Sequence, residues 1–212
     1  MDKQGWTSLA KDSLLRKKYG SYDEYLQHQA SKLGKIDWLK KYHGEFRTAL
    51  KERAADLVGM RPGATVLCLG ARTGAECEAF TDLGALAIGI DLNPGEANKH
   101  VVTGDFHHLQ YADAVFDFAY TNALDHAMEL GRMLGEVRRV LKPGGVFNAE
   151  IVLGSSDEGG RDPGAYESLW WERVDSIIEA VSRSGFWVAR KRPFEFPWNG
   201  VSVEFVRSSS AS

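Results

Sequence analysis

The chain has 212 residues, of which 43% are hydrophobic and 11% aromatic, and its 26 Lys and Arg residues nearly balance its 29 Asp and Glu residues. This composition is typical of one globular domain with a sizeable core, and it excludes a disordered acidic chain, a collagen-like chain and a disulfide-stapled miniprotein. No apolar run approaches the roughly 20 residues of a membrane-spanning helix, and the N-terminus does not resemble a signal peptide, so we expect a cytoplasmic location.

The charges are unevenly distributed along the chain. Residues 1–60 carry 12 Lys or Arg and 8 Asp or Glu, whereas residues 61–212 carry 14 and 21. The acidic main body argues against nucleic acid as a partner, because contacts with phosphates need basic surface. Cys68 and Cys77 have neither Cys-x-x-Cys spacing nor a nearby His pair, so we interpret them as core residues rather than as a metal or redox site. The oligomeric state stays open.

The first 60 residues are predicted to be helical. One helix is expected from about Asp23 to Leu33, and Gly34 ends it. A second helix carries one apolar face, which consists of Phe46, Ala49, Leu50, Ala54 and Leu57. We therefore predict an N-terminal helical cover, residues 1–60, and a main domain, residues 61–212, within a single compact unit.

From Ala64 onward, short apolar runs alternate with helical segments. The predicted strands are 65–69, 85–90, 101–102, 115–120 and 146–153, and the predicted helices between them are 75–83 and 130–141. Fully apolar runs are typical of strands that are buried on both faces of a parallel sheet. The alternation predicts an α/β fold of three layers, with helices on both faces of a doubly wound, mostly parallel sheet.

The C-terminal part breaks this alternation. After a Gly- and Ser-rich loop, 154–164, we predict a helix from about Tyr166 to Ser184 and then two strands, 186–192 and 201–207. The loop between these strands is too short for a parallel crossover, so they are expected to pair antiparallel.

Small and acidic residues stand where three successive predicted strands end. The turn Gly70-Ala71-Arg72-Thr73-Gly74 follows the first strand, Asp91 and Leu92 follow the second, and Asp105 and Phe106 follow the third. Glycine allows a ligand to approach the backbone, a carboxylate at Asp91 could accept both hydrogen bonds of a ribose diol, and Phe106 could stack on adenine. Each feature alone also fits an ordinary turn or helix cap, but together they predict a nucleoside-binding site.

The ordered motifs resemble those of class I S-adenosyl-L-methionine (SAM)-dependent methyltransferases. The resemblance rests on residues 66–74, Gly89-Ile90-Asp91, Gly104-Asp105, Phe116-Asp117-Phe118 and 136–145, and it covers roughly residues 60–153. It implies a seven-stranded sheet with an antiparallel last strand and SAM as the cofactor. The turn at Gly70 would lie under the methionine part, Asp91 on the ribose and Asp105 near the adenine. The expected cofactor-binding residues are Gly70, Ala71, Arg72, Gly74, Glu76, Asp91, Leu92, Asp105, Phe106 and Asn122.

Two positions depart from the family's pattern. Cys68 stands where the family usually has an acidic residue, and Arg72 replaces the usual second glycine of the turn. We expect Glu76, in the first turn of the following helix, to compensate as an acceptor for the methionine ammonium or for Arg72. The connection Leu92–His100 is also too short for a full crossover helix, which leaves one side of the adenine pocket open or covered by the N-terminal helices.

The candidate catalytic residues follow the fourth predicted strand. His126, next to Asp125, could take a proton from a hydroxyl or amine acceptor, and Asn122 could hold the methionine group. The alternative is that Asp125 or Asn122 caps the next helix and that His126 packs or points to solvent, and both interpretations stay open.

The pair His107-His108 does not predict a metal site. Adjacent residues on an extended segment point in opposite directions, and no third ligand has suitable spacing, so we expect a surface loop here and no metal. A magnesium-assisted transfer that uses Asp105, Asp125 or Asp157 remains an alternative.

Aromatic residues outside the cofactor half are the candidates for binding an acceptor. Tyr166 and Trp170 follow the fifth strand, and Tyr25 and His28 lie in the N-terminal cover, where they could form a lid. Packing in the core or on the sheet is the alternative for each. Trp171 would point elsewhere on the predicted helix.

We therefore expect a SAM-dependent methyltransferase that acts on O or N of a small-molecule acceptor, with neither nucleic acid nor a membrane as partner. A nicotinamide-dependent oxidoreductase is the alternative enzyme, but the turn lacks the Gly-x-Gly-x-x-Gly pattern and Tyr166 is not followed by a Lys four residues later. A non-catalytic SAM-binding module, suggested by Cys68 and Arg72, is a third interpretation.

Overall fold

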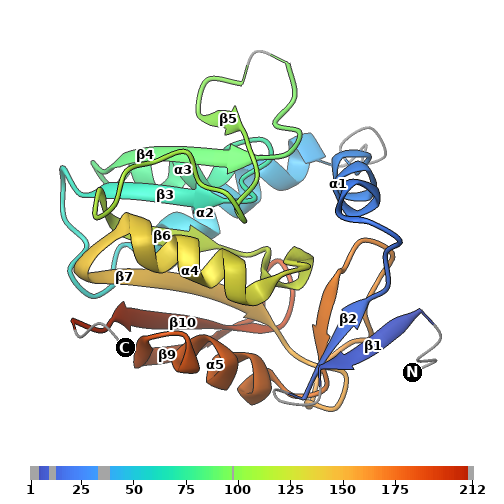
Figure 1. The fold of residues 1–212 in the computed structure, drawn as a ribbon. Coiled ribbons are helices and arrows are strands. Elements are labelled where there is room, and N and C mark those ends of the chain that lie inside the picture. Colours follow the sequence, from blue (N-terminus) through green and yellow to red (C-terminus); the bar gives the residue numbers. More distant parts are fainter. Residues whose placement is uncertain (1–4, 10–12, 33–38, 97, 210–212) are drawn as a thin grey trace.

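A seven-stranded sheet forms the centre of the molecule (Figure 1). The computed structural model describes residues 5–9, 13–32, 39–96 and 98–209. The strands, in spatial order, are β5 (Val101–Thr103), β4 (Leu86–Asp91), β3 (Thr65–Leu69), β6 (Phe116–Thr121), β7 (Leu141–Val152), β10 (Gly200–Arg207) and β9 (Phe186–Phe194). Strands β3 to β7 pair parallel, and β10 pairs antiparallel with both of its neighbours. The predicted sheet and its reversed last strand are confirmed.

Helices cover both faces of this sheet. α2 (Leu39–Ala54) and α3 (Ala75–Thr81) pack on one face, and α4 (Leu130–Val140) and α5 (Val174–Arg183) pack on the other (Figure 1). Successive side chains of a strand point to opposite faces, so Val66 of β3 packs with the first helix pair and Leu67 with the second. The three-layer prediction is therefore confirmed. None of the helices in the described ranges is both long and apolar enough to cross a membrane.

The N-terminal cover is not purely helical, contrary to the prediction. It begins with β1 (Trp6–Leu9) and β2 (Leu14–Lys17) before α1 (Tyr22–Ala30), and β2 pairs with β8 (Leu169–Trp171). The helix predicted from Tyr166 to Ser184 is present as α5 (Val174–Arg183), but its predicted start is wrong because residues 169–171 form β8. Strands of three or four residues are stabilised mainly by partners that are distant in sequence, here Leu14 opposite Trp171. The predicted helix end at Leu33 and Gly34 lies outside the described residues, and the division at residue 60 stays a prediction.

α1 lies over the carboxyl ends of β4 and β5. No helix occupies the described part of the 92–100 connection, as its length predicted. Instead, the carbonyl oxygen of Ala30, at the end of α1, accepts a hydrogen bond from Asn93 at 2.9 Å. The described end of α1 therefore contacts this connection, whereas the adenine site itself stays a prediction.

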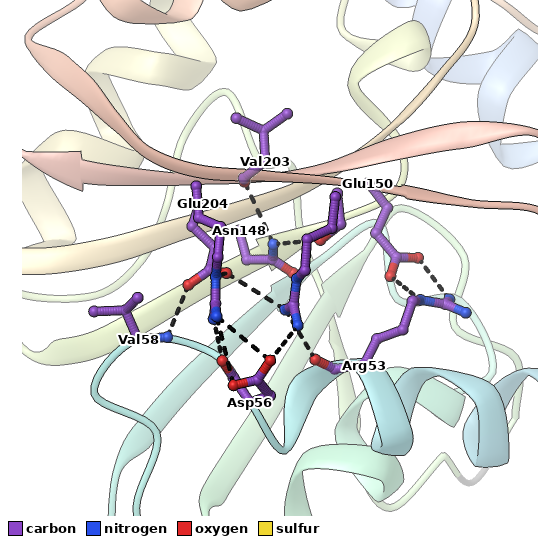
Figure 2. Close-up of polar contacts among 10 residues, drawn as sticks. Arg53, Asp56, Val58, Asn148, Glu150, Val203 and Glu204 are labelled. Carbon is purple, nitrogen blue, oxygen red and sulfur yellow. Dashed lines mark hydrogen bonds and ion pairs between the residues drawn. The ribbon is translucent and has the colours of Figure 1, made fainter.

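A buried ion pair joins α2 to the sheet (Figure 2). The guanidinium of Arg53 donates to both carboxylate oxygens of Glu150, at 2.7 and 3.0 Å. Glu204 on β10 accepts from Arg190 and from the backbone N–H of Val58, just beyond α2. These contacts hold α2 against β7 and β10, and Glu150 itself reaches the cavity described next.

Candidate cofactor and acceptor site

A cavity lies at the carboxyl ends of the parallel strands. The predicted cofactor residues that line it are Gly70, Ala71, Arg72, Glu76, Asp91, Leu92, Asp105, Phe106 and Asn122. Gly74 does not line the cavity but begins α3 as its N-cap, with φ at 91°. In open α/β sheets, ligands bind at this edge of the sheet.

The turn after β3 brings its backbone close to the cavity. Gly70 has φ at 70°, and a Cβ there would lie 2.8 Å from the Cβ of Ala123, so the position suits only glycine. The N–H of Arg72 donates to Asp91 Oδ2 at 3.0 Å, and the N–H of Asn93 donates to Asp91 Oδ1 at 2.8 Å. These two bonds fix the orientation of the carboxylate, and each oxygen keeps one further lone pair for a diol.

Glu76 is a buried acid on the wall of the cavity. Glu76 is 7% exposed, and burial raises the pKa of its carboxyl to about 8. Asn122 Nδ2 lies 3.4 Å from Glu76 Oε1, and no Lys or Arg in the described part of the chain forms an ion pair with Glu76. A buried carboxyl that faces a cavity and has no ion-pair partner among the described Lys and Arg residues fits a ligand ammonium group.

Asp105 is held by α1 and by His107, two residues later in the chain. Its carboxylate accepts from Tyr22 Oη at 2.5 Å and from the backbone and ring of His107 at 2.9 and 2.8 Å. Burial opposes ionisation, but these hydrogen bonds outweigh it and hold the pKa of Asp105 well below its usual range. The surface-loop prediction is therefore wrong for His107, which is fully buried, although the neighbouring His108 is about half-exposed.

Asp125 and His126 lie at the other end of the cavity, on the turn η2 (Leu124–His126). The ring nitrogen Nδ1 of His126 is 3.0 Å from the carbonyl oxygen of Tyr166, so Nδ1 carries the proton. Nε2 lies 2.9 Å from Lys32 Nζ. Burial, together with the charge of Lys32, lowers the pKa of His126 to about 3. The imidazole is therefore neutral at pH 7, and its Nε2 lone pair faces Lys32.

Three charged residues beside His126 were not among the predicted site residues. Lys32, Arg161 and Glu167 all line the cavity, and Arg161 Nη2 is 2.9 Å from Glu167 Oε1. Burial raises the pKa of Asp125, and the same Arg161 nitrogen lies 3.7 Å from it. No local sequence pattern distinguishes these residues, because they meet only when α1 and the 154–168 loop fold over the end of β6.

The candidate acceptor residues divide into two groups. Tyr25 lines the cavity and donates from Oη to the carbonyl oxygen of His126 at 3.1 Å. His28 and Tyr166 stack on each other with ring centroids 5.1 Å apart, and neither is among the lining residues of the described chain. On β8, Trp171 lines the cavity and Trp170 does not, the reverse of what the predicted helix implied.

Comparisons with known proteins agree with this arrangement. Residues 67–149 match the family model described as a methyltransferase domain. The chain is 34% identical to a sterol 24-C-methyltransferase of Schizosaccharomyces pombe over 61% of this chain and 41% of that protein. It is 33% identical to a malonyl-[acyl-carrier protein] O-methyltransferase of Pseudescherichia vulneris over 62% of this chain and 55% of that protein.

A solved structure has a similar fold. It is the 1,6-didemethyltoxoflavin-N1-methyltransferase of Burkholderia thailandensis with 1,6-didemethyltoxoflavin and S-adenosylhomocysteine bound. It superposes with a TM-score of 0.66 at 19% identity, over 96% of this chain and 99% of that one. The chain spans only about a third to a half of the length of the curated relatives that it matches first.

Proposed function

We propose, from the premise that residues 67–149 form a class I SAM-dependent methyltransferase domain, that the protein binds SAM in this cavity and transfers its methyl group to O or N of a small-molecule acceptor. The observation that carries the proposal is the convergence of the Gly70 turn, Glu76 and Asp91 on one cavity at the carboxyl ends of the strands. SAM, when bound, supplies a methyl group on a positively charged sulfur, which is already a good leaving group.

The residues of the cavity fit the parts of SAM. Glu76, with Asn122 beside it, would accept hydrogen bonds from the methionine ammonium, in agreement with the compensating role expected for it. Asp91 would hold the ribose diol, and Phe106 would pack on the adenine beside Asp105. Tyr22 already donates to Asp105, so α1 would close over the adenine end.

The remaining part of the cavity favours a small acceptor. Tyr25, Trp171 and Trp198 provide aromatic walls, and Lys32, Asp125 and Arg161 provide charges next to them. The names of the similar proteins mention a sterol, a malonyl group on an acyl-carrier protein and 1,6-didemethyltoxoflavin. An acceptor with an apolar body and one polar reacting atom suits such a lining.

Isothermal titration calorimetry tests cofactor binding. SAM and S-adenosylhomocysteine should bind, whereas NAD(H) should not. Glu76→Gln should weaken SAM binding about 10- to 100-fold, because a charge-assisted hydrogen bond is lost. Glu78→Gln is the matched control, since Glu78 lies on the same helix but pairs with Arg47 outside the cavity. Binding of NAD(H) without SAM would overturn the proposal.

Transfer is then measured with labelled SAM on phenolic, carboxylic and amine acceptors, and the product is analysed by mass spectrometry. O- or N-methylated product supports the proposal. Methylation at carbon would contradict the predicted reacting atom, and SAM binding without transfer to any acceptor would favour a non-catalytic module.

A further inference from the structure

Lys32 occupies an unusual place for a lysine. It follows α1, it lines the cavity, and its Nζ is 2.9 Å from His126 Nε2 and 5.5 Å from the centroid of the Tyr166 ring. Because His126 Nδ1 donates to a backbone carbonyl, Nε2 can only accept, and Lys32 must donate one N–H to it. This bond fixes the orientation of the amine, and the remaining hydrogens or lone pair on Nζ point away from the imidazole.

The surroundings of Lys32 favour the neutral amine more than water does. Burial, followed by the positive charge of Arg72, lowers the pKa of Lys32 to about 8, while Asp125, Glu167 and Asp91 act in the opposite direction. The cavity therefore holds an amine that is partly unprotonated near neutral pH, next to an imidazole that stays neutral. Such a lysine is a suitable proton acceptor.

We propose that Lys32 Nζ is the group that takes the proton from the methyl acceptor, and that His126 is a positioning residue that aims this amine into the cavity. The proposal rests on the proposed methyltransferase function. The sequence suggests His126 as the proton acceptor. This proposal assigns that role to Lys32, which donates a hydrogen bond to the unprotonated ring nitrogen of His126.

The transfer balances without any further reactant. An electron pair on the acceptor oxygen or nitrogen forms the bond to the methyl carbon, and the carbon–sulfur bond breaks with its electron pair left on sulfur. The proton of the acceptor's O–H or N–H moves to the lone pair of Lys32 Nζ, which becomes an ammonium. This ammonium remains hydrogen-bonded to His126 and is attracted by Asp125 and Glu167 until it loses the proton to solvent.

The proposal narrows the class of acceptor. The reacting atom must carry a proton that is lost on methylation, as in a phenol or a protonated amine, rather than a carboxylate oxygen or a carbon–carbon double bond. An amine of this pKa matches phenols and ammonium groups, since proton transfer is most effective between groups of similar acidity.

Two substitutions at Lys32 separate proton acceptance from charge. Lys32→Met removes both, and Lys32→Arg keeps the charge but cannot accept a proton at neutral pH. Both variants should bind SAM within about threefold of the parent but lower kcat about 100- to 10,000-fold. The rise of the parent's kcat/KM through pH 8 should disappear in both. Retention of kcat in Lys32→Arg would overturn the proposal in favour of a charge that binds the acceptor.

Two substitutions at His126 test its positioning role. Glutamine can place an acceptor near the position of Nε2, whereas asparagine places its polar group near Nδ1. His126→Gln should therefore keep most of kcat and the pH profile, and His126→Asn should lower kcat at unchanged SAM affinity. Equal effects of the two variants, with no change in the pH profile, would contradict positioning of Lys32.

A measurement without any methyl acceptor tests the pKa of Lys32 separately from the proposed methyltransferase function. The parent protein is labelled with a trace of acetic anhydride across pH 6 to 11, and the acetylation of each lysine is followed by mass spectrometry, with Lys191 of β9 as an internal reference for the reagent. Lys32 should titrate near pH 8. A midpoint above pH 10, as for an ordinary lysine, would overturn this proposal even if SAM transfer is found. Loss of SAM binding by the parent would instead overturn the proposed function.

Discussion

Arg72 has a backbone conformation that residues with side chains rarely adopt. Its φ is 38°, between two glycines at 70° and 91°, in the turn that faces the cavity. Class I SAM-dependent methyltransferases, which the sequence resembles, usually have glycine at this position. This chain therefore adopts the left-handed conformation with an arginine instead of a glycine. The charge of Arg72 acts on the ionisation of Glu76 and of Lys32, so the residue that replaces glycine also adds a positive charge to the cavity wall.

Two replacements of Arg72 isolate the cost of this conformation. Arg72→Gly and Arg72→Ala remove the same charge, but only alanine keeps a Cβ in the left-handed region. Arg72→Gly should therefore be more stable than Arg72→Ala by about 1 kcal/mol, the reverse of the usual order of these two residues. Urea unfolding monitored by circular dichroism measures the difference. An alanine variant that is as stable as the glycine variant would show that the turn is not strained at Arg72.

At the scale of elements, the central sheet was predictable and its N-terminal cover was not. The parallel strands of the seven-stranded sheet follow mainly from apolar runs next to Gly or Asp, which are local signals. β1, β2 and β8 have no such signal, because Leu14 and Leu15 are stabilised by Trp171 and Trp170, more than 150 residues along the chain. The predicted cofactor residues gathered because strand ends meet at one edge, but Lys32, Arg161 and Glu167 depend on how α1 and a loop cross that edge.

The docking of α2 on the sheet depends on one buried ion pair. The side chain of Glu150 is fully buried, and Arg53 contacts it from α2 (Figure 2). Arg53→Met would leave a buried carboxylate without its cation and should lower the free energy of unfolding by about 3–5 kcal/mol. Adding Glu150→Gln in the same chain should recover part of this loss, because the unpaired charge is then absent.

Arg61→Met is the matched control for the Arg53–Glu150 ion pair, because it removes an arginine from an exposed ion pair. Arg61 pairs with Asp117, but its side chain is 60% exposed, so its removal should cost at most about 1 kcal/mol. Denaturant unfolding of the four proteins compares the two pairs. If Arg53→Met is as mild as Arg61→Met, α2 is held by its apolar face, with Phe46 and Leu50, rather than by the ion pair.

At the scale of the whole molecule, groups on the cavity wall control how stability depends on pH. The pKa of Glu76 rises from 4.5 unfolded to about 8 folded, so its contribution is complete below pH 4.5 and is lost as pH rises through 8. The pKa of His126 falls from 6.5 to about 3, so its contribution is present above pH 6.5 and is lost as pH falls through 3. The two opposing slopes cancel between about pH 4.5 and 6.5.

The free energy of unfolding should therefore change less steeply from pH 4.5 to 6.5, where the raised pKa of Asp125 adds a decline, and should then fall by roughly 2 kcal/mol up to pH 8, where the slope of Glu76 acts without that of His126. Above pH 8 it should rise again, because Lys32 binds its proton less tightly when folded, with a pKa of about 8 against 10.5 unfolded. Urea unfolding at half-unit steps of pH measures this profile. Glu76→Gln should abolish the decline, and saturating SAM should reverse it if its ammonium pairs with the ionised Glu76. A decline that persists in Glu76→Gln would assign it to another group.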